Sequence, residues 1–346
     1  MSVQANQIAR NPTRLLGRRS LLLPGLAVSI ALLGVMLILG MMVGAADIEP
    51  AVVFDALFHY DETVFNHLII QTVRLPQVLA GMIVGAALAV AGAIMQGLTR
   101  NPLADSGLLG INAGAAFAVV LTVYLVGAAS LTVYSIAALI GAAAGAVFVY
   151  VIGMLGGGAT PLRLTLAGVI LTAFMSALTT AILIQDQETL EQIRFWTAGS
   201  LVGRDFSIIA QTAPLIVIGL IGALLISRQI TTISLGDDVA KGLGQNTVAI
   251  KIAAALMVVL LAGGAVALAG PIGFVGLVIP HIARFVVGVD YRWVIPYSAV
   301  FGAILVILAD IGARIIMRPQ VLPVGIMMAL VGAPFFIYLA RWKVRR

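Results

Sequence analysis

GMIVGAALAVAGAIMQGLTRNPLADSGLLGINAG, residues 81–114, is the stretch that decides the fold. Its first part is apolar and dense in Gly and Ala, and Gly81 and Gly85 have the spacing that lets helices pack closely in lipid. The dipeptide Asn101-Pro102 ends this helix, because proline lacks a backbone donor and disfavours helical geometry at the preceding residue. Irregular backbone at a membrane boundary needs protein or a water-filled path around it, so the stretch indicates part of a conduit. An ordinary loop between two spans is the alternative.

The composition is that of a membrane protein. Of 346 residues, 61% are hydrophobic and 10% charged, whereas a soluble domain carries about 25% charged residues. The absence of cysteine excludes disulfides, thiolate metal sites and cysteine nucleophiles. The histidines have no metal-ligand spacing, and no G-x-x-x-x-G-K-[ST] motif for a nucleotide phosphate is present. We therefore predict no catalytic residue, no metal site and no cofactor bound by this chain.

Apolar runs divide the chain into about ten spans, each roughly long enough to cross a bilayer. The predicted spans are 21–43, 77–98, 111–128, 134–155, 164–184, 207–227, 248–269, about 274–287, 293–316 and 324–340. A cleavable signal peptide is the alternative for the first run, but such peptides have apolar regions of only about 7–15 residues. The prediction is an all-α polytopic membrane protein, with a cytoplasmic basic tail at 1–19 and a transmembrane domain at 20–346.

The distribution of cationic residues predicts the orientation. With the N-terminus in the cytoplasm, most of the 20 Lys and Arg residues lie inside, and the outer set is Arg74, Arg194, Arg204, Arg314 and Arg318. Both termini are therefore predicted to be cytoplasmic, and the positive charge is an orientation signal rather than a nucleic-acid surface. Residues 77–184 and 248–340 each hold about four spans with an early Gly/Pro interruption, which predicts two inverted halves.

Ionisable side chains are rare inside the predicted spans. Asp310 is the main exception, and Arg314, four residues later on the same helix, can pair with it. A carrier coupled to protons or ions usually keeps such groups within the membrane, so this chain is predicted to be driven from outside itself. The polar cytoplasmic stretch 228–247, RQITTISLGDDVAKGLGQNT, is the predicted place for that input. An autonomous secondary carrier or facilitator is the alternative class.

Seven motifs occur in a recognisable order. They are RLPQ at 74–77, GAALAVAGAIMQGLTRNPLADSGLLGINAGA at 85–115, LAGVIL at 166–171, FWTAGSL at 195–201, SLGDDVAKGLG at 234–244, GPIGFVGLVIPHIAR at 270–284 and LPVGIMMALVGAPFFIYL at 322–339. In these motifs the chain resembles the FecCD or BtuC-like permease subunits of bacterial ABC importers for iron–siderophore, haem and cobalamin. The resemblance covers nearly the whole chain after about residue 20.

The resemblance implies a type II ABC importer permease in the bacterial cytoplasmic membrane. It implies a second permease subunit, in a homodimer or a paralogous heterodimer, with two ATPase subunits that hold ATP and magnesium. It also implies an extracytoplasmic substrate-binding protein, and a path between the permeases lined largely by the fifth span. An iron(III)–siderophore is the expected substrate class, with haem and cobalamin as alternatives.

The resemblance also implies roles for particular residues. Those expected to couple the chain to the ATPase are Leu235, Gly236, Asp237, Asp238, Val239, Ala240, Lys241, Gly242, Leu243 and Gly244. Those expected at a cytoplasmic gate are Asn101, Pro102, Leu103, Thr160, Pro161 and Leu162. Arg74 and Arg314 are expected to dock the binding protein, and Arg318 is a further candidate because Gln77 stands where the family often has a second arginine. Pairing with Asp310 is the alternative for Arg314, and snorkelling to the interface is the alternative for Arg74.

Overall fold

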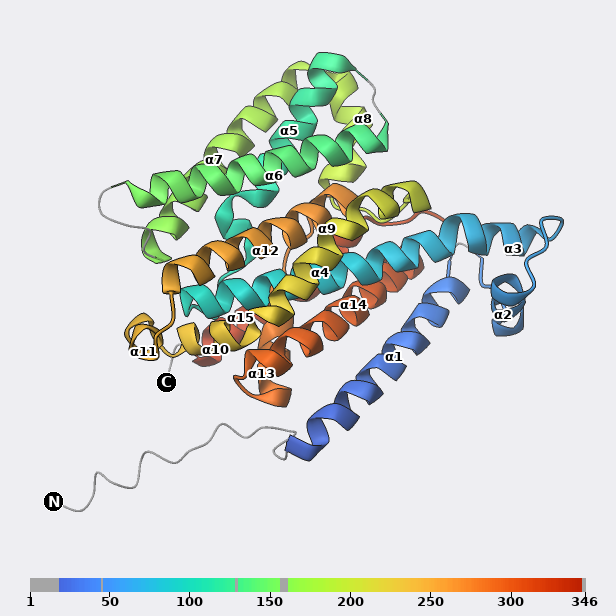
Figure 1. Ribbon diagram of the computed structural model, residues 1–346. Helices are drawn as coiled ribbons and strands as arrows, with labels where there is room; N and C mark the ends of the chain where they lie inside the picture. Colours follow the sequence, from blue (N-terminus) through green and yellow to red (C-terminus); the bar gives the residue numbers. More distant parts are fainter. Residues whose placement is uncertain (1–18, 45, 128–129, 156–160, 344–346) are drawn as a thin grey trace.

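The computed structural model describes residues 19–44, 46–127, 130–155 and 161–343, so almost all of the predicted basic tail lies outside it. The described elements, shown in Figure 1, are helical. They are η1 (Arg19–Leu21), α1 (Leu22–Met42), α2 (Pro50–Phe58), α3 (Phe65–Ile69), η2 (Ile70–Arg74), α4 (Leu75–Thr99), η3 (Ser106–Leu109), α5 (Ile111–Val126), α6 (Leu131–Met154), α7 (Pro161–Gln185), α8 (Gln187–Thr197), α9 (Phe206–Leu225), α10 (Ser227–Ser234), α11 (Asp237–Gly242), α12 (Thr247–Ala269), α13 (Val275–Val287), α14 (Tyr291–Ile316) and α15 (Val324–Lys343).

The predicted all-α membrane fold is confirmed. Seven helices of the described residues are long and apolar enough to cross a bilayer, and three shorter apolar helices, α5, α13 and the first part of α15, match the remaining predicted spans. Apart from the start of the second span, the ends of the spans agree with the prediction to within a few residues, because apolar runs and Gly or Pro breaks determine them. The relation between two inverted halves stays a prediction.

Helix α4 is the centre of the bundle. Its apolar window is 83% buried, and in Figure 1 it runs between α12 on one side and α14 on the other. At its crossing with α14, a Cβ on Gly85 would lie 2.2 Å from the carbonyl oxygen of Gly302, and a Cβ on Gly302 would lie equally close to Gly85. Only glycine therefore allows these two backbones to touch, as the spacing of small residues in the sequence predicted.

Helices α1 and α7 lie at the edge of the bundle. Only 6% of the apolar window of α1 and 17% of that of α7 is buried within this chain. Within a membrane, the side chains that such helices leave uncovered face lipid, another protein chain or a path between chains. The fold therefore leaves α7 with a large face available to a partner.

One span differs from its predicted boundaries. The helix containing α4 begins at Phe65 and continues through a π-helical turn at 70–74 to Thr99, 35 residues in all. At 1.5 Å per residue it exceeds the hydrocarbon thickness of about 30 Å, so its first turns project beyond the membrane. The eighth span agrees with the prediction: Gly270 and Phe274 have positive φ (75° and 69°), and α13 begins at Val275, just after the predicted break.

Candidate functional site

The predicted coupling segment, residues 228–247, forms two short helices, α10 and α11, at one end of the bundle (Figure 1). Gly236 separates α10 from α11 with φ 132°, a backbone conformation that residues other than glycine rarely adopt. Gly244, two residues after the end of α11, has φ 77°. In α11, Asp237 and Asp238 occupy the first turn and Lys241 the last, which suits the helix dipole. The sequence pattern of short polar helices with glycine breaks is thus observed.

The coupling segment carries apolar side chains on its surface. Leu235 is 65% exposed, Val239 47% and Leu243 72%, whereas Ala240 is buried beneath them. Asp238, Lys241 and Gly242 are also exposed. An exposed apolar group rimmed by polar residues is typical of a protein-binding surface.

Asp237 is engaged within the chain. Its Oδ2 lies 2.5 Å from Nζ of Lys251 in α12, and both side chains are about one third exposed. Gln245 donates from Nε2 to the carbonyl oxygen of Gln229 at 3.2 Å, which joins the end of the segment back to α10. The first contact joins α11 to α12, and the second joins the residues after α11 to α10.

The predicted gate residues after α4 form a turn on the surface. Arg100 ends α4 in the left-handed conformation, with φ 52°. The side-chain Oδ1 of Asn101 accepts from the backbone N of Leu103 at 3.0 Å, and Asn101, Pro102 and Leu103 are exposed. This turn sits at the same end of α4 as the coupling segment, because α10 packs on the last turns of α4.

The second group of predicted gate residues lies at the start of α7. Thr160 lies outside the described residues, Pro161 is the first residue of α7, and Leu162 is 69% exposed. Pro fits the first turn of a helix, where its missing N–H has no partner to lose. Whether the two turns meet across a pair of chains stays a prediction, since one chain is described.

Arg74 and Arg314 do not lie on the outer surface as the docking prediction requires. They are 6% and 3% exposed. Arg74 donates from Nη1 to the carbonyl oxygens of Met41 and Met42, each at 2.7 Å, and from Nη2 to Ala46. Arg314 donates from Nη1 to Gly40 and Val43, at 2.8 and 3.0 Å. The two guanidinium groups thus bind carbonyl oxygens in the last turn of α1 and in the residues just after it.

Asp310 and Gln77 complete this buried cluster. Asp310 pairs with Arg314 through Oδ2 and accepts from Nε2 of Gln77 at 2.9 Å through Oδ1. The alternative given for Arg314, an ion pair with Asp310, is the arrangement observed. Gln77 therefore joins α4 to α14 inside the protein, a contact that its place in the RLPQ motif did not indicate.

Arg318 is the accessible member of the predicted docking set. It lies just after α14 and donates from Nη2 to Oδ1 of Asp47 at 2.7 Å. The two side chains are 37% and 63% exposed. The hydrogen bond from Arg318 lowers the pKa of Asp47 below its ordinary value. Asp47 is therefore charged at neutral pH. Because an exposed ion pair contributes only about 0–1 kcal/mol, a carboxylate of another protein can readily replace Asp47 as the partner of Arg318.

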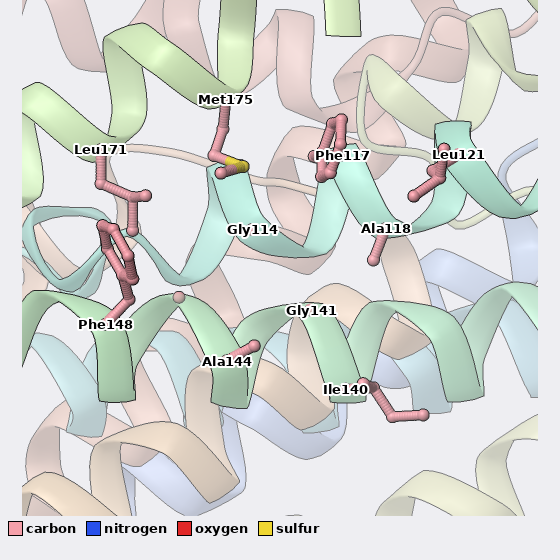
Figure 2. A pocket seen from close by; sticks show the side chains of 11 residues that line it. Gly114, Phe117, Ala118, Leu121, Ile140, Gly141, Ala144, Phe148, Leu171 and Met175 are labelled. Atoms are coloured by element: carbon pink, nitrogen blue, oxygen red, sulfur yellow. The ribbon is translucent and has the colours of Figure 1, made fainter. Parts of the chain in front are cut away.

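A cavity of about 290 Å³ lies between α5, α6 and α7. Figure 2 shows apolar side chains from all three helices around it, among them Phe117, Phe148 and Met175. It offers almost no polar atom to a ligand, so it does not have the chemistry to select a polar metal chelate. Among the described residues, no group of three or more His, Asp or Glu side chains could hold a metal ion.

Comparison with known protein families shows the family to which the chain belongs. The model of the FecCD transport family matches residues 32–342. The chain belongs to the FecCD transport family. It is 48% identical over 311 residues to the iron(3+)-hydroxamate import system permease protein FhuB of Bacillus subtilis, covering 89% of this chain and 80% of that one. It is 40% identical over 328 residues to the ferric enterobactin permease FepD of Escherichia coli, covering 94% and 97%.

A haem relative and a solved structure extend the comparison. The hemin transport system permease protein HmuU of Yersinia pestis is 41% identical over 272 residues, 77% of this chain and 81% of that protein. A solved structure described as an inward-facing metal-chelate type ABC transporter matches with a TM-score of 0.82 and 27% identity, covering 92% of this chain and 99% of that one. This FecCD chain is therefore a multi-pass permease of the bacterial inner membrane, with the fold of an ABC transporter permease.

Proposed function

We propose that the chain is the permease subunit of an ATP-driven importer that carries an iron(III) chelate into the bacterial cytoplasm. The observation that carries this proposal is the match over most of the chain to permeases named for ferric hydroxamate and ferric enterobactin. Haem is the second candidate, supported by the match to the hemin permease of Yersinia pestis. For cobalamin, no relative cited above gives support.

The proposed assembly contains a second permease, two ATPase subunits and an external binding protein. ATP and magnesium would be held by the ATPase subunits, and both termini of this chain would be cytoplasmic. The exposed apolar side chains of the coupling segment support an ATPase contact. In this proposal a separate ATPase supplies the energy for transport, whereas an autonomous carrier would need no such subunit.

The proposed path runs along the exposed face of α7, between two permeases. That face carries Leu166, Ile170 and Phe174, and also the exposed hydroxyl-bearing residues Ser176 and Thr180 among alanines. Small and hydroxyl side chains are common where transmembrane helices meet or line a path. The low burial of α7 within one chain supports this placement.

Uptake by cells tests the proposed substrate. Cells with and without this chain are offered ferric hydroxamate, ferric enterobactin, ferric citrate, haem and cobalamin, each labelled. We expect the chain to increase uptake of one ferric chelate, with the other compounds at the background of the deletion strain. Uptake of haem alone would favour the second candidate, and uptake of none would contradict both.

The gate proposal predicts crosslinking that depends on nucleotide. The chain has no cysteine, so Leu103→Cys and Leu162→Cys, at side chains 41% and 69% exposed, introduce single reporters. We expect each to crosslink to its copy, or to the matching position of a paralogue, in only one of the ATP-bound and nucleotide-free states. Leu155→Cys, 69% exposed at the end of α6, is the control and should not depend on nucleotide. Equal crosslinking of Leu103→Cys in both states would indicate a static turn.

The docking proposal now centres on Arg318. Exchanging Arg318 for Glu should slow association of the loaded binding protein by several-fold at low salt, because rim charges act mainly on the association rate. The effect should shrink at high salt, where exposed charges are screened. Association rates are measured with the complex in nanodiscs, and Arg194→Glu, another exposed outer cation, is the control. An unchanged rate for Arg318→Glu at low salt would exclude this residue from docking.

A further inference from the structure

Helix α13 contains a proline that leaves one backbone acceptor without its usual donor. Pro280 lies within α13, and because proline has no N–H, the carbonyl oxygen of Gly276, four residues earlier, loses its intrahelical hydrogen bond. Gln96 of α4 supplies the missing donor, with Nε2 2.9 Å from the oxygen of Gly276 and 3.3 Å from that of Leu277. The amide thus acts as a donor in place of the proline.

The same amide has a second partner. Oε1 of Gln96 accepts from Nη2 of Arg284 at 2.5 Å, which fixes the orientation of the amide, and Gln96 is only 4% exposed. Arg284 also lies 3.2 Å from Nδ1 of His281 and interacts with the side chain of Tyr291, the first residue of α14. Buried polar groups in such a network are worth more together than singly, and they fix one arrangement of the elements they join.

Tyr291 connects this network to the coupling segment. Its backbone N donates to Oγ1 of Thr231 in α10 at 2.9 Å. Its ring packs on α4 at Gly97, where a Cβ would lie 2.9 Å from the phenol oxygen and 2.7 Å from a side-chain carbon of Ile230. A shift of α10 therefore moves Tyr291 and, through it, Arg284.

The other end of the network reaches the segment that follows the gate turn. A Cβ on Gly276 would lie 2.4 Å from Oδ1 of Asp105 and 3.1 Å from Cα of Gly92. The first turn of α13 thus packs between α4 and the 101–110 segment, and at Gly276 the backbone itself makes the contact because glycine has no side chain. Displacement of α13 must be taken up by Asp105 and its neighbours, because packed backbones do not compress.

We propose that Gln96 is a positioning residue for transport, which links the coupling segment to the gate through Arg284, Tyr291 and the proline kink of α13. The inference rests on the proposed function, since it assigns a path by which ATPase movement reaches the 101–110 segment.

The test separates the two roles of the amide. In proteoliposomes holding the permease, its ATPase and its binding protein, uptake of radioactive ferric hydroxamate and ATP hydrolysis are measured together. Gln96→Leu is expected to raise the ATP consumed per chelate imported by about tenfold and to lower the unfolding temperature. Adding Pro280→Ala, which restores an N–H for Gly276 but leaves Arg284 without its acceptor, should recover part of the loss in unfolding temperature but not the ratio. Arg284→Met should raise the ratio in the same way.

Controls make each outcome decisive. Ser135→Ala removes a buried hydrogen bond between α6 and α12, from Oγ of Ser135 to the oxygen of Ala267 at 2.8 Å, and should lower stability without changing the ratio. A normal ratio for Gln96→Leu, or recovery of the ratio in the double variant, would overturn the proposal and leave Gln96 a structural residue. Absence of ATP-driven uptake with the unaltered chain and the full chelate panel would instead contradict the proposed function.

Discussion

Exchange of Leu235 and Leu243 for Asp is expected to separate the chain from its ATPase and to abolish uptake. The two side chains are 65% and 72% exposed, and apart from Val239 the other exposed residues of 235–244 are polar or glycine. Burying one leucine contributes about 1.5–3 kcal/mol, so losing two costs at least about 3 kcal/mol of association. That corresponds to a more than hundredfold weaker complex, since each 1.4 kcal/mol is tenfold.

Co-purification of the ATPase with the permease, together with uptake, measures this effect. Val289→Asp is the matched control, because Val289 is 52% exposed in the turn between α13 and α14 at the same end of the bundle. The control should retain the ATPase. If the Leu235/Leu243 variant assembles and transports at the normal rate, the segment does not carry the coupling contact.

Replacement of Arg314 by Met is expected to destabilise the membrane domain by about 3–5 kcal/mol, the usual cost of leaving the other member of a buried ion pair without its partner. Asp310 would remain 3% exposed with only Gln77 to bind it, and the carbonyl oxygens of Gly40 and Val43 would lose their donor. Thermal unfolding in nanodiscs and the amount of protein in the membrane measure the loss.

Two further variants identify the cause of this destabilisation. Arg318→Met removes an exposed pair and should change stability by at most about 1 kcal/mol. Asp310→Leu combined with Arg314→Met should recover part of the stability, because apolar side chains can replace a buried pair, but α1 stays without its anchor. Normal stability of Arg314→Met with lost affinity for the binding protein would support the docking role and contradict the structural one.

The sequence predicted the spans well because local features determine them. The length of each apolar run, the glycine spacing in α4 and the helix-ending Asn101-Pro102 can all be recognised within a short stretch of the sequence. The short α13 was also predicted, from the Gly/Pro break at 270–273, although the left-handed Phe274 that precedes it is not a residue type that favours this conformation. The extension of α4 back to Phe65 was missed because the region before Arg74 reads as amphipathic and acidic rather than as a span.

The contacts that assign roles to single residues are distant in sequence. Arg314 and Gly40 are separated by 274 positions, and Arg284 and Gln96 by 188. A motif carries residue types but not the partners they meet, so the sequence did not show that Arg314 binds the end of α1, and its docking role stays a prediction. For Gln96 one signal was present, namely an amide within a run of small apolar residues, with a proline in a later predicted helix.

ATP-dependent uptake in a purified system tests the central claim, that this chain is a permease driven by a separate ATPase. Proteoliposomes containing the chain with or without the ATPase subunits are given the loaded binding protein outside the permease and ATP on the ATPase side, with ferric hydroxamate carrying radioactive iron as cargo. The account predicts uptake only when the ATPase, ATP and the binding protein are all present, with none under a proton or sodium gradient alone. Uptake by the chain alone, driven by such a gradient or by the chelate concentration, would contradict it.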